Sequence, residues 1–149
     1  MHPLPFLPCS KGAVNGPAEG SVNSTNPLCA REEDPTTPAA LTVAPCFLPN
    51  ALAGPYWVLA VGHNSEDPSK YDWAVISGGQ PTEAYPDGCT TKLTGTNGSG
   101  LWIFGRAPVL PADQLAAARA SLTGLGFTLS QLLDVPQAGC DYEWATVKY

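Results

Sequence analysis

The sequence predicts a mainly β protein with antiparallel strands and one α-helix near its C-terminus. Short apolar stretches separated by turn residues follow residue 40, and a helical spacing of apolar residues occurs once, after Pro111. Proline (16) and glycine (15) are plentiful, whereas charged residues make up only 13% of the chain. This composition favours a β-rich chain with many turns over a helical bundle. A length of 149 residues with 44% hydrophobic residues suits one domain with one packed core.

Four segments have the apolar pattern of strands. They cover residues 41–48, 56–61, 73–77 and 101–104. In the first, Leu41, Val43 and Phe47 fall on one side, and Pro45 is expected at an edge or a bulge. Turn residues and no helix separate the four, so antiparallel pairing is expected. Strands that are apolar on both sides need a helix or sheet against one face and an apolar interior against the other.

One helix is predicted after Pro111, which suits a first helical turn, and Asp113 complements the positive end of the helix dipole. Its apolar stripe is narrow and is expected to pack on the outside of a sheet. The stripe consists of Leu115, Ala118 and Leu122. Gly124 and Gly126 are expected to end the helix. Residues 132–135 are predicted to form a last short strand, and residues 80–100 a long polar connection.

The composition of the chain changes near residue 38. Residues 1–37 are rich in Pro, Gly, Ser, Asn and Thr and are expected to be irregular, with remnants of early strands. Residues 38–149 are expected to form the folded domain. The acidic run Glu32, Glu33 and Asp34 is interpreted as a solvated loop rather than an acid–base site.

Charge and motif spacing argue against several kinds of function. A net charge of -6 with only seven basic residues disfavours nucleic acid as a partner. The sequence has no recognisable Ser/His/Asp arrangement, phosphate loop or metal-ligand cluster, so no catalytic residue, metal or cofactor is expected. His63 is interpreted as a solvated loop histidine rather than a general base. No apolar run approaches the roughly 20 residues of a membrane span.

Cysteine usage predicts an oxidising environment. The cysteines are widely spaced at Cys9, Cys29, Cys46, Cys89 and Cys140. In a Gly- and Pro-rich chain this is typical of disulfides formed outside the cytosol, with buried thiols as the alternative, and the odd count leaves one thiol free or paired with another chain. Sequons at Asn23 and Asn97 are candidate glycosylation sites. A secreted or lumenal location is therefore expected, although the first residues lack the regions of a signal peptide.

The order of these segments resembles the C-terminal part of the lipocalin family, above all the branch of apolipoprotein D and the bacterial lipocalins. The resemblance covers about residues 38–140. The matching segments are residues 41–47, 54–59, 71–75 and 101–108, followed by the helix and Gly126-Phe127. The resemblance implies an antiparallel up-and-down β-barrel with the C-terminal α-helix packed on its outside.

The resemblance also assigns structural roles. Tyr71 and Asp72 correspond to the family's second signature region and Arg106 to the third, where the arginine packs over a tryptophan of the first strand. No Gly-x-Trp signature precedes residue 40. We therefore expect a barrel that is incomplete at its N-terminal side and has an open sheet edge, through which a homodimer can form.

Some disulfide pairings are implied by the same resemblance. Cys89 lies in the loop before the third signature strand and Cys140 after the last strand, and both positions pair with N-terminal cysteines in the family. Cys9 or Cys29 is the expected partner of Cys140, and a Cys89–Cys140 bond is the competing possibility.

The resemblance implies that the chain binds and transports a small hydrophobic ligand of the fatty acid, retinoid, sterol or carotenoid class in its barrel. The expected lining residues are Tyr56, Trp57, Val58, Leu59, Trp73, Val75, Trp102 and Phe104. Which side of each strand faces the ligand is left open, and core packing is the alternative for every one. Peripheral association with membranes or lipids is a further expectation.

Two other functions remain open at this point. A chain with missing strands is expected to act as a lipocalin remnant that pairs its open edge with another protein chain. A lipocalin-type enzyme, such as an isomerase or a de-epoxidase, is the third class. For an enzyme of this kind Cys46 is the candidate thiol, although no basic residue lies near it in the sequence to lower its pKa.

Overall fold

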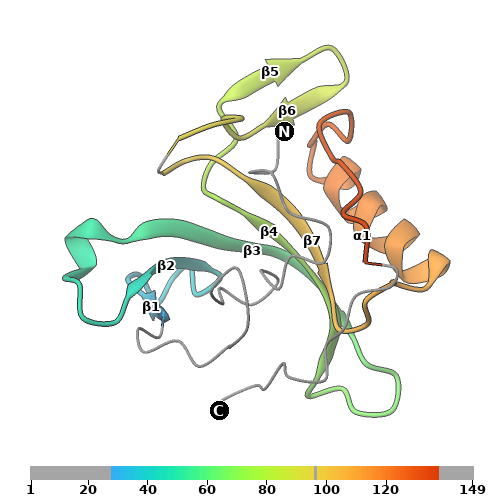
Figure 1. Ribbon diagram of the computed structural model, residues 1–149, viewed down its shortest axis with the longest axis horizontal. Helices are drawn as coiled ribbons and strands as arrows, with labels where there is room; N and C mark the ends of the chain where they lie inside the picture. The colour runs from blue at the N-terminus through green and yellow to red at the C-terminus, as the bar shows by residue number, and fades with distance from the viewer. Residues whose placement is uncertain (1–27, 96, 138–149) are drawn as a thin grey trace.

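The central element is an antiparallel sheet of five strands in the order β1-β2-β3-β4-β7 (Figure 1). The computed structural model describes residues 28–95 and 97–137. The strands are β1 (Leu28–Glu32), β2 (Ala40–Pro45), β3 (Gly54–His63), β4 (Tyr71–Ser77) and β7 (Leu101–Gly105). Neighbours in the sheet are also neighbours in the sequence, except that β7 follows β4 after an inserted hairpin. The predicted mainly β architecture with antiparallel strands is confirmed.

The inserted hairpin consists of β5 (Glu83–Tyr85) and β6 (Gly88–Thr90). It lies in the segment predicted to be a polar connection, and it projects from one end of the sheet (Figure 1). The Cys89 backbone N–H donates to the Gly126 carbonyl at 2.9 Å, and the Thr128 N–H donates to the Cys89 carbonyl at 2.8 Å. These two bonds attach the hairpin to the chain that follows the helix, a long-range pairing that local sequence patterns do not reveal.

The predicted helix is present as α1 (Ala112–Gly124), preceded by Pro111 and with Asp113 in its first turn. A short 3-10 helix, η2 (Asn50–Leu52), connects β2 to β3. The predicted last strand at residues 132–135 is wrong, because this segment pairs with no strand. Leu132 packs against the core and Asp134 forms an ion pair with Arg119 at 3.4 Å, so the segment lies along the helix instead.

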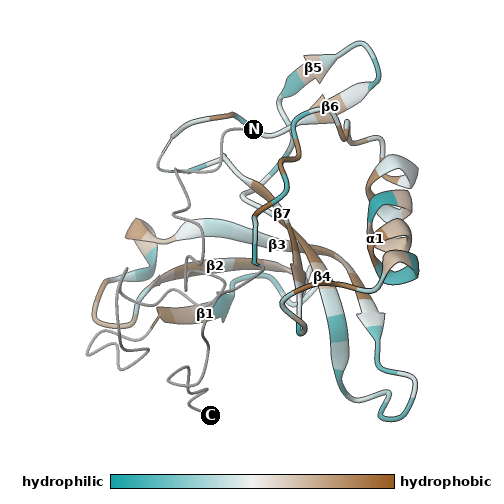
Figure 2. Ribbon diagram, turned by 45° about the vertical axis from the view of Figure 1, so that its right-hand side comes forward, coloured by the Kyte–Doolittle hydropathy of each residue, from teal (hydrophilic) through white to brown (hydrophobic). Residues whose placement is uncertain are grey.

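The hydrophobic core lies between α1 and one face of the sheet. Ala118 and Leu122 of the helix are completely buried. The sheet contributes Trp73, Val75 and Leu101, and Phe127 closes the cluster after the helix. Figure 2 shows apolar stretches in β2, β4 and β7, whereas the loop between β3 and β4 is hydrophilic. The narrow apolar stripe of the helix therefore covers one side of the sheet, as its spacing predicts.

Strand register assigns each sheet residue to one of two faces, since directly paired residues share a face. On the helix-facing side, Ala60 pairs with Val75, and Val75 with Ile103. On the opposite side, Val58 pairs with Ile76, and Ile76 with Trp102. The register shifts between Val58 and Ala60, which leaves Leu59 in a β-bulge. The bulge changes which residues of β3 face the helix.

The described strands form an open sheet, so the prediction of a barrel is corrected. Within residues 28–95 and 97–137, β1 and β7 are the two outermost strands and do not pair with each other. Closing a sheet around one ligand takes about eight strands, more than the five that join here. β1 falls in the segment predicted to be irregular with strand remnants. No helix in the described part of the chain has the length and apolar character needed to cross a membrane.

Candidate functional site

The sheet presents a second apolar surface on the side away from α1, which we call the helix-distal face. It combines side chains from four strands, because cross-strand partners stand on the same side of the sheet. On β2, β3, β4 and β7 the face consists of Leu41, Val43, Tyr56, Val58, Val61, Ala74, Ile76, Trp102 and Phe104, all apolar or aromatic. The outer strand β1 adds Ala30 opposite Val43 and the exposed carboxylate Glu32 opposite Leu41. The strands are thus apolar on both sides, as the sequence predicts.

Two aromatic rings of β7 form the most extended part of this face. The rings of Trp102 and Phe104 stack with centroids 6.3 Å apart and an interplanar angle of 9°. The indole of Trp102 also lies over Gly100, where an added Cβ would come within 1.9 Å of the ring. Ile76, the cross-strand neighbour of Trp102, is only 2% exposed. The two parallel rings are partly exposed, so they, rather than the buried Ile76, offer flat surface that suits an elongated apolar ligand.

Tyr56 contributes the one hydroxyl of the helix-distal face. It stands opposite Leu41 in the β2–β3 pairing. Burial raises the pKa of its phenol above the usual 10.0, because a phenolate is poorly solvated there. The phenol therefore remains neutral at physiological pH and is able to donate a hydrogen bond within an otherwise apolar surface.

The structure divides the predicted ligand-binding residues between the two faces. Four lie on the helix-distal face: Tyr56, Val58, Trp102 and Phe104. The other four do not lie on this face. Trp57, Trp73 and Val75 are on the helix-facing side of the sheet, and Leu59 is in the β-bulge. Trp73 and Val75, 9% and 0% exposed, pack in the core under α1 and do not line the helix-distal face. For these two the alternative of core packing is the correct one.

Five members of the helix-distal face were not predicted from the sequence. They are Leu41, Val43, Val61, Ala74 and Ile76. Alternation from Tyr56 and Val58 would not have placed Val61, because the bulge at Leu59 shifts the parity of β3. Alternation along β2 and β4 indicates that Leu41 and Val43, and likewise Ala74 and Ile76, share a face. Which face that is depends on the pairing register between strands.

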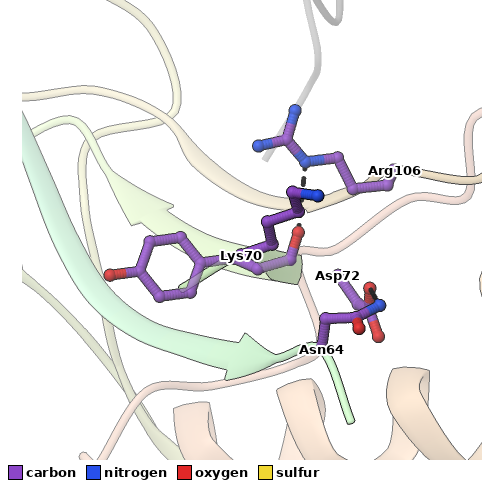
Figure 3. A pocket seen from close by; sticks show the side chains of 5 residues that line it. Asn64, Lys70, Asp72 and Arg106 are labelled. Carbon is purple, nitrogen blue, oxygen red and sulfur yellow. Dashed lines mark hydrogen bonds between the residues drawn. The ribbon is translucent and has the colours of Figure 1, made fainter. Parts of the chain in front are cut away.

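At the end of the sheet beyond Phe104 lies a polar hollow of about 400 Å³, which we call the end hollow (Figure 3). Its lining residues are Asn64, Lys70, Tyr71, Asp72 and Arg106. They come from the β3–β4 hairpin and from the chain just after β7. The residues expected to be structural, Tyr71, Asp72 and Arg106, are therefore neighbours here.

Hydrogen bonds hold the residues of the end hollow in place. Arg106 donates from its backbone N–H to the Asp72 carbonyl at 2.8 Å and from Nε to the Tyr71 carbonyl at 3.1 Å. The Asp72 carboxylate accepts from the Asn64 amide at 2.8 Å and from the Gln114 amide of α1 at 3.2 Å. Asp72 thus joins the hairpin to the helix. The tryptophans of the described residues lie on β3, β4 and β7, so none occupies the first-strand position expected beneath Arg106.

The loop between β3 and β4 is built from local hydrogen bonds. The Asn64 side-chain oxygen accepts the backbone N–H groups of Glu66 and Asp67, each at 2.9 Å. Asp67 accepts from the Ser69 hydroxyl and forms an ion pair with Lys70 at 3.1 Å. The Ser69 hydrogen bond is the main cause of the lowered pKa of Asp67.

His63 has a structural environment in this loop. Its ring Nδ1 lies 2.8 Å from the Pro68 carbonyl, and the ring meets Tyr71 edge-on at a centroid distance of 4.9 Å. The side chain is exposed. These contacts of His63 are within the hairpin and none is with a nucleophile, which agrees with its interpretation as a loop histidine.

One disulfide joins Cys29 on β1 to Cys46 just after β2. The possibility that Cys29 pairs with Cys140 is therefore wrong, and Cys46, which was not a predicted disulfide residue, is its partner. The expectation failed because β1 pairs directly with β2, which brings the two Cα atoms to 4.9 Å. As a disulfide sulfur, Cys46 does not supply the free thiol of the enzyme alternative.

Cys89 is a free cysteine, so its expected disulfide is absent, and its Sγ lies 3.2 Å from the Gly126 carbonyl oxygen. The sequon residue Asn97 is exposed on the connection to β7. Cys9, Cys140 and Asn23 lie outside the described residues. Among the residues that are described, no three His, Cys, Asp or Glu side chains gather in a way that would hold a metal ion.

The sequence was compared with known protein families and with curated proteins. No family model matches the chain. The chain is 26% identical to mouse apolipoprotein D over 111 residues, which is 74% of this chain and 49% of apolipoprotein D. The chain thus spans about half the length of the curated relative it matches. Together with the antiparallel sheet and C-terminal helix, this match supports a lipocalin-like relationship.

Proposed function

We propose that this protein binds a small hydrophobic ligand on its helix-distal face and acts as a carrier rather than an enzyme. The ligand classes are fatty acids, retinoids, sterols and carotenoids. The observation that carries the proposal is the second apolar side of the sheet, with the stacked rings of Trp102 and Phe104 beside Ile76. The similarity to apolipoprotein D supports it.

The hydrophobic effect supplies enough free energy for such binding. Removing apolar surface from water is worth roughly 25 cal/mol per Å², so burying on the order of 300 Å² would contribute about 7 kcal/mol before entropic losses. The aromatic rings provide flat surface at little cost in side-chain entropy. Micromolar affinity is therefore the expected range.

A secreted or lumenal carrier is part of this proposal. The disulfide between Cys29 and Cys46 supports it, because such bonds persist mainly in oxidising compartments. Transport, and peripheral contact with lipids during loading, belong to the same proposal.

Ligand titration tests the proposal. Retinol is added to the full chain while tryptophan fluorescence is recorded, and saturable one-to-one quenching is expected. Phe104→Ala should weaken binding by about tenfold, because it removes an aromatic contact worth roughly 1.4 kcal/mol. Phe47→Ala is the matched control, since Phe47 is 69% exposed and outside the helix-distal face. Equal effects of both substitutions would contradict the assignment of the site.

The second candidate function is pairing of an open sheet edge with another protein chain, and the same sample distinguishes it from the carrier. β1 (Leu28–Glu32) is an outermost strand of the described sheet, and an outer strand presents backbone groups that a second chain is able to pair with. No quenching by retinol or by a fluorescent fatty acid, together with a dimeric size in gel filtration, would favour this edge-pairing function over the carrier.

A further inference from the structure

We propose that Arg106 and Lys70 in the end hollow bind the carboxylate of an amphipathic anion whose alkyl chain lies on the helix-distal face. The preferred ligand class is then a fatty acid rather than a neutral retinoid or sterol. This inference rests on the proposed function, because it requires an apolar ligand on that face.

The end hollow lies just beyond the end of β7. Arg106 directly follows Gly105, the last residue of β7, and its backbone N–H donates to the Asp72 carbonyl at 2.8 Å. If the alternation of β7 is continued by one residue, Arg106 falls on the same side as Phe104, about 7 Å away along the chain direction. In Figure 3 the Arg106 guanidinium lies away from α1, whereas Asn64 and Asp72 are on the side of the helix. Arg106 therefore places a positive charge at the β7 end of the aromatic surface.

Arg106 has donors available for a ligand. Only its Nε is engaged, with the Tyr71 carbonyl, and within the described residues its two terminal nitrogens have no hydrogen-bond or ion-pair partner. The planar guanidinium matches the two oxygens of a carboxylate. Lys70 adds a second positive charge on a long side chain that is 73% exposed and paired with Asp67.

The one carboxylate in the end hollow does not neutralise this pair. Asp72 accepts hydrogen bonds from the amides of Asn64 and Gln114, and its side chain turns toward α1. It forms no ion pair with Arg106 or Lys70 among the described residues. The Arg106 guanidinium therefore retains its attraction for an external anion, whereas the Lys70 ammonium has to exchange its partner Asp67 to join it.

The distribution of charge across the chain makes this pair distinctive. The net charge is -6, and the described residues contain five of the seven cations: Arg31, Lys70, Lys92, Arg106 and Arg119. Arg119 pairs with Asp134, and Arg31 donates to Asn50 and to nearby carbonyls. The end hollow is the pocket that holds two of the five. Lys70 is paired with Asp67, so Arg106 is the cation of the hollow without an ion-pair partner among the described residues, and next to an apolar surface it favours amphipathic anions.

Paired ligands of equal chain length test the inference. Dodecanoate and dodecanol compete with the neutral fluorescent probe 1-aminoanthracene for the full chain. Dodecanoate should bind several-fold more tightly, and its advantage should shrink as salt is raised from 20 mM to 500 mM, because the cations are exposed to solvent.

Charge-removing variants locate the effect. Arg106→Gln should weaken dodecanoate by about three- to fivefold, the size expected for a solvent-exposed ion pair, and leave dodecanol unchanged. Lys70→Gln should cause a smaller loss without disturbing the sheet, since its side chain is exposed. Lys92→Gln removes the same charge on the connection between β6 and β7 and should change neither ligand. Thermal unfolding of each variant verifies that the fold is retained.

The outcomes separate this inference from the proposed function. Equal affinity for dodecanoate and dodecanol in the unmodified chain, with no response to Arg106→Gln or Lys70→Gln, would overturn the carboxylate site and leave the hydrophobic carrier intact. Absence of binding by either ligand and by the probe would overturn the carrier itself. A loss of both ligands to the same extent in a folded Arg106→Gln variant would also contradict a specific role for the charge.

Discussion

The indole of Trp73 lies directly over the backbone of Gly62, its cross-strand partner on β3. A Cβ added at residue 62 would stand 1.9 Å from the Trp73 Nε1. Trp73 is 9% exposed and belongs to the core under α1. Because Gly62 has no side chain, the indole of Trp73, the largest side chain of the core, fits over the backbone at this position. Gly62 lies just before the hairpin that leads to the end hollow.

We predict that Gly62→Ala destabilises the protein by about 1–3 kcal/mol, because a buried indole has little room to move and overpacking forces it from its place. Urea unfolding followed by tryptophan fluorescence measures this. Gly124→Ala is the control, since nothing lies within 4 Å of an added Cβ there and alanine favours a helix. A neutral effect of Gly62→Ala would contradict the packing described for Trp73.

Leu122 is expected to be the strongest single contributor of α1 to stability. It is completely buried against the sheet, so Leu122→Ala should lower the free energy of unfolding by about 2–5 kcal/mol. Leu125→Ala, at a position that is 52% exposed, should lower it by less than about 0.5 kcal/mol. Similar losses at the two positions, measured by thermal unfolding, would show that α1 does not cover the sheet as described.

Removal of the Cys29–Cys46 disulfide should destabilise the β1–β2 edge. The bond closes a sequence separation of 17 residues, for which the reduced entropy of the unfolded chain contributes about 2–4 kcal/mol. Cys46→Ser together with Cys29→Ser should therefore lower the melting temperature. Cys89→Ser, which removes a free thiol, should leave it nearly unchanged. Mass spectrometry of a non-reduced digest checks the pairing, and a Cys29 peptide linked to Cys140 would refute it.

Tyr56 should titrate above 10.0 in the absence of ligand, because burial opposes the phenolate. Since the folded state holds the proton more tightly than the unfolded state, this contribution to stability is complete below pH 10 and is lost as the pH rises through the raised pKa. Ultraviolet difference spectroscopy of the unmodified chain and of Tyr56→Phe isolates the transition. A saturating apolar ligand should move it higher still, and a downward shift on binding would argue against a ligand beside Tyr56.

Asn97 is expected to carry an N-linked glycan when the chain is secreted by a eukaryotic host, because its side chain is exposed and its sequon is complete. Treatment with an N-glycosidase should reduce the apparent mass. Ser99→Ala should abolish the Asn97 modification while the sequon at Asn23 provides the internal comparison. An unmodified Asn97 in the secreted protein would refute the prediction.

Local patterns were sufficient for most of the elements, and the helix shows why. Pro111, Asp113 and the spacing of Ala118 and Leu122 are all short-range signals, and α1 forms where they predict. The hairpin of β5 and β6 was missed, since its bonds to Gly126 and Thr128 span more than 35 residues. The disulfide was missed for a related reason. Cys29 and Cys46 become neighbours only through the pairing of β1 with β2.

For the candidate site, the aromatic residues of β7 were identified from hydrophobicity alone, but their face was not. Trp73 and Trp102 are equally apolar in the sequence, yet one packs in the core and the other on the helix-distal face. The bulge at Leu59 then reverses the parity of β3, which no count of alternating residues would reveal.

Composition and local spacing alone thus specified an antiparallel β protein with two-sided apolar strands and one covering helix, because turn residues and periodicity act over a few positions. Strand register alone decided which side of each strand meets the helix, and the pairing of β1 with β2 decided which cysteines join. Register is a property of the whole sheet, and a shift of one residue exchanges its two faces.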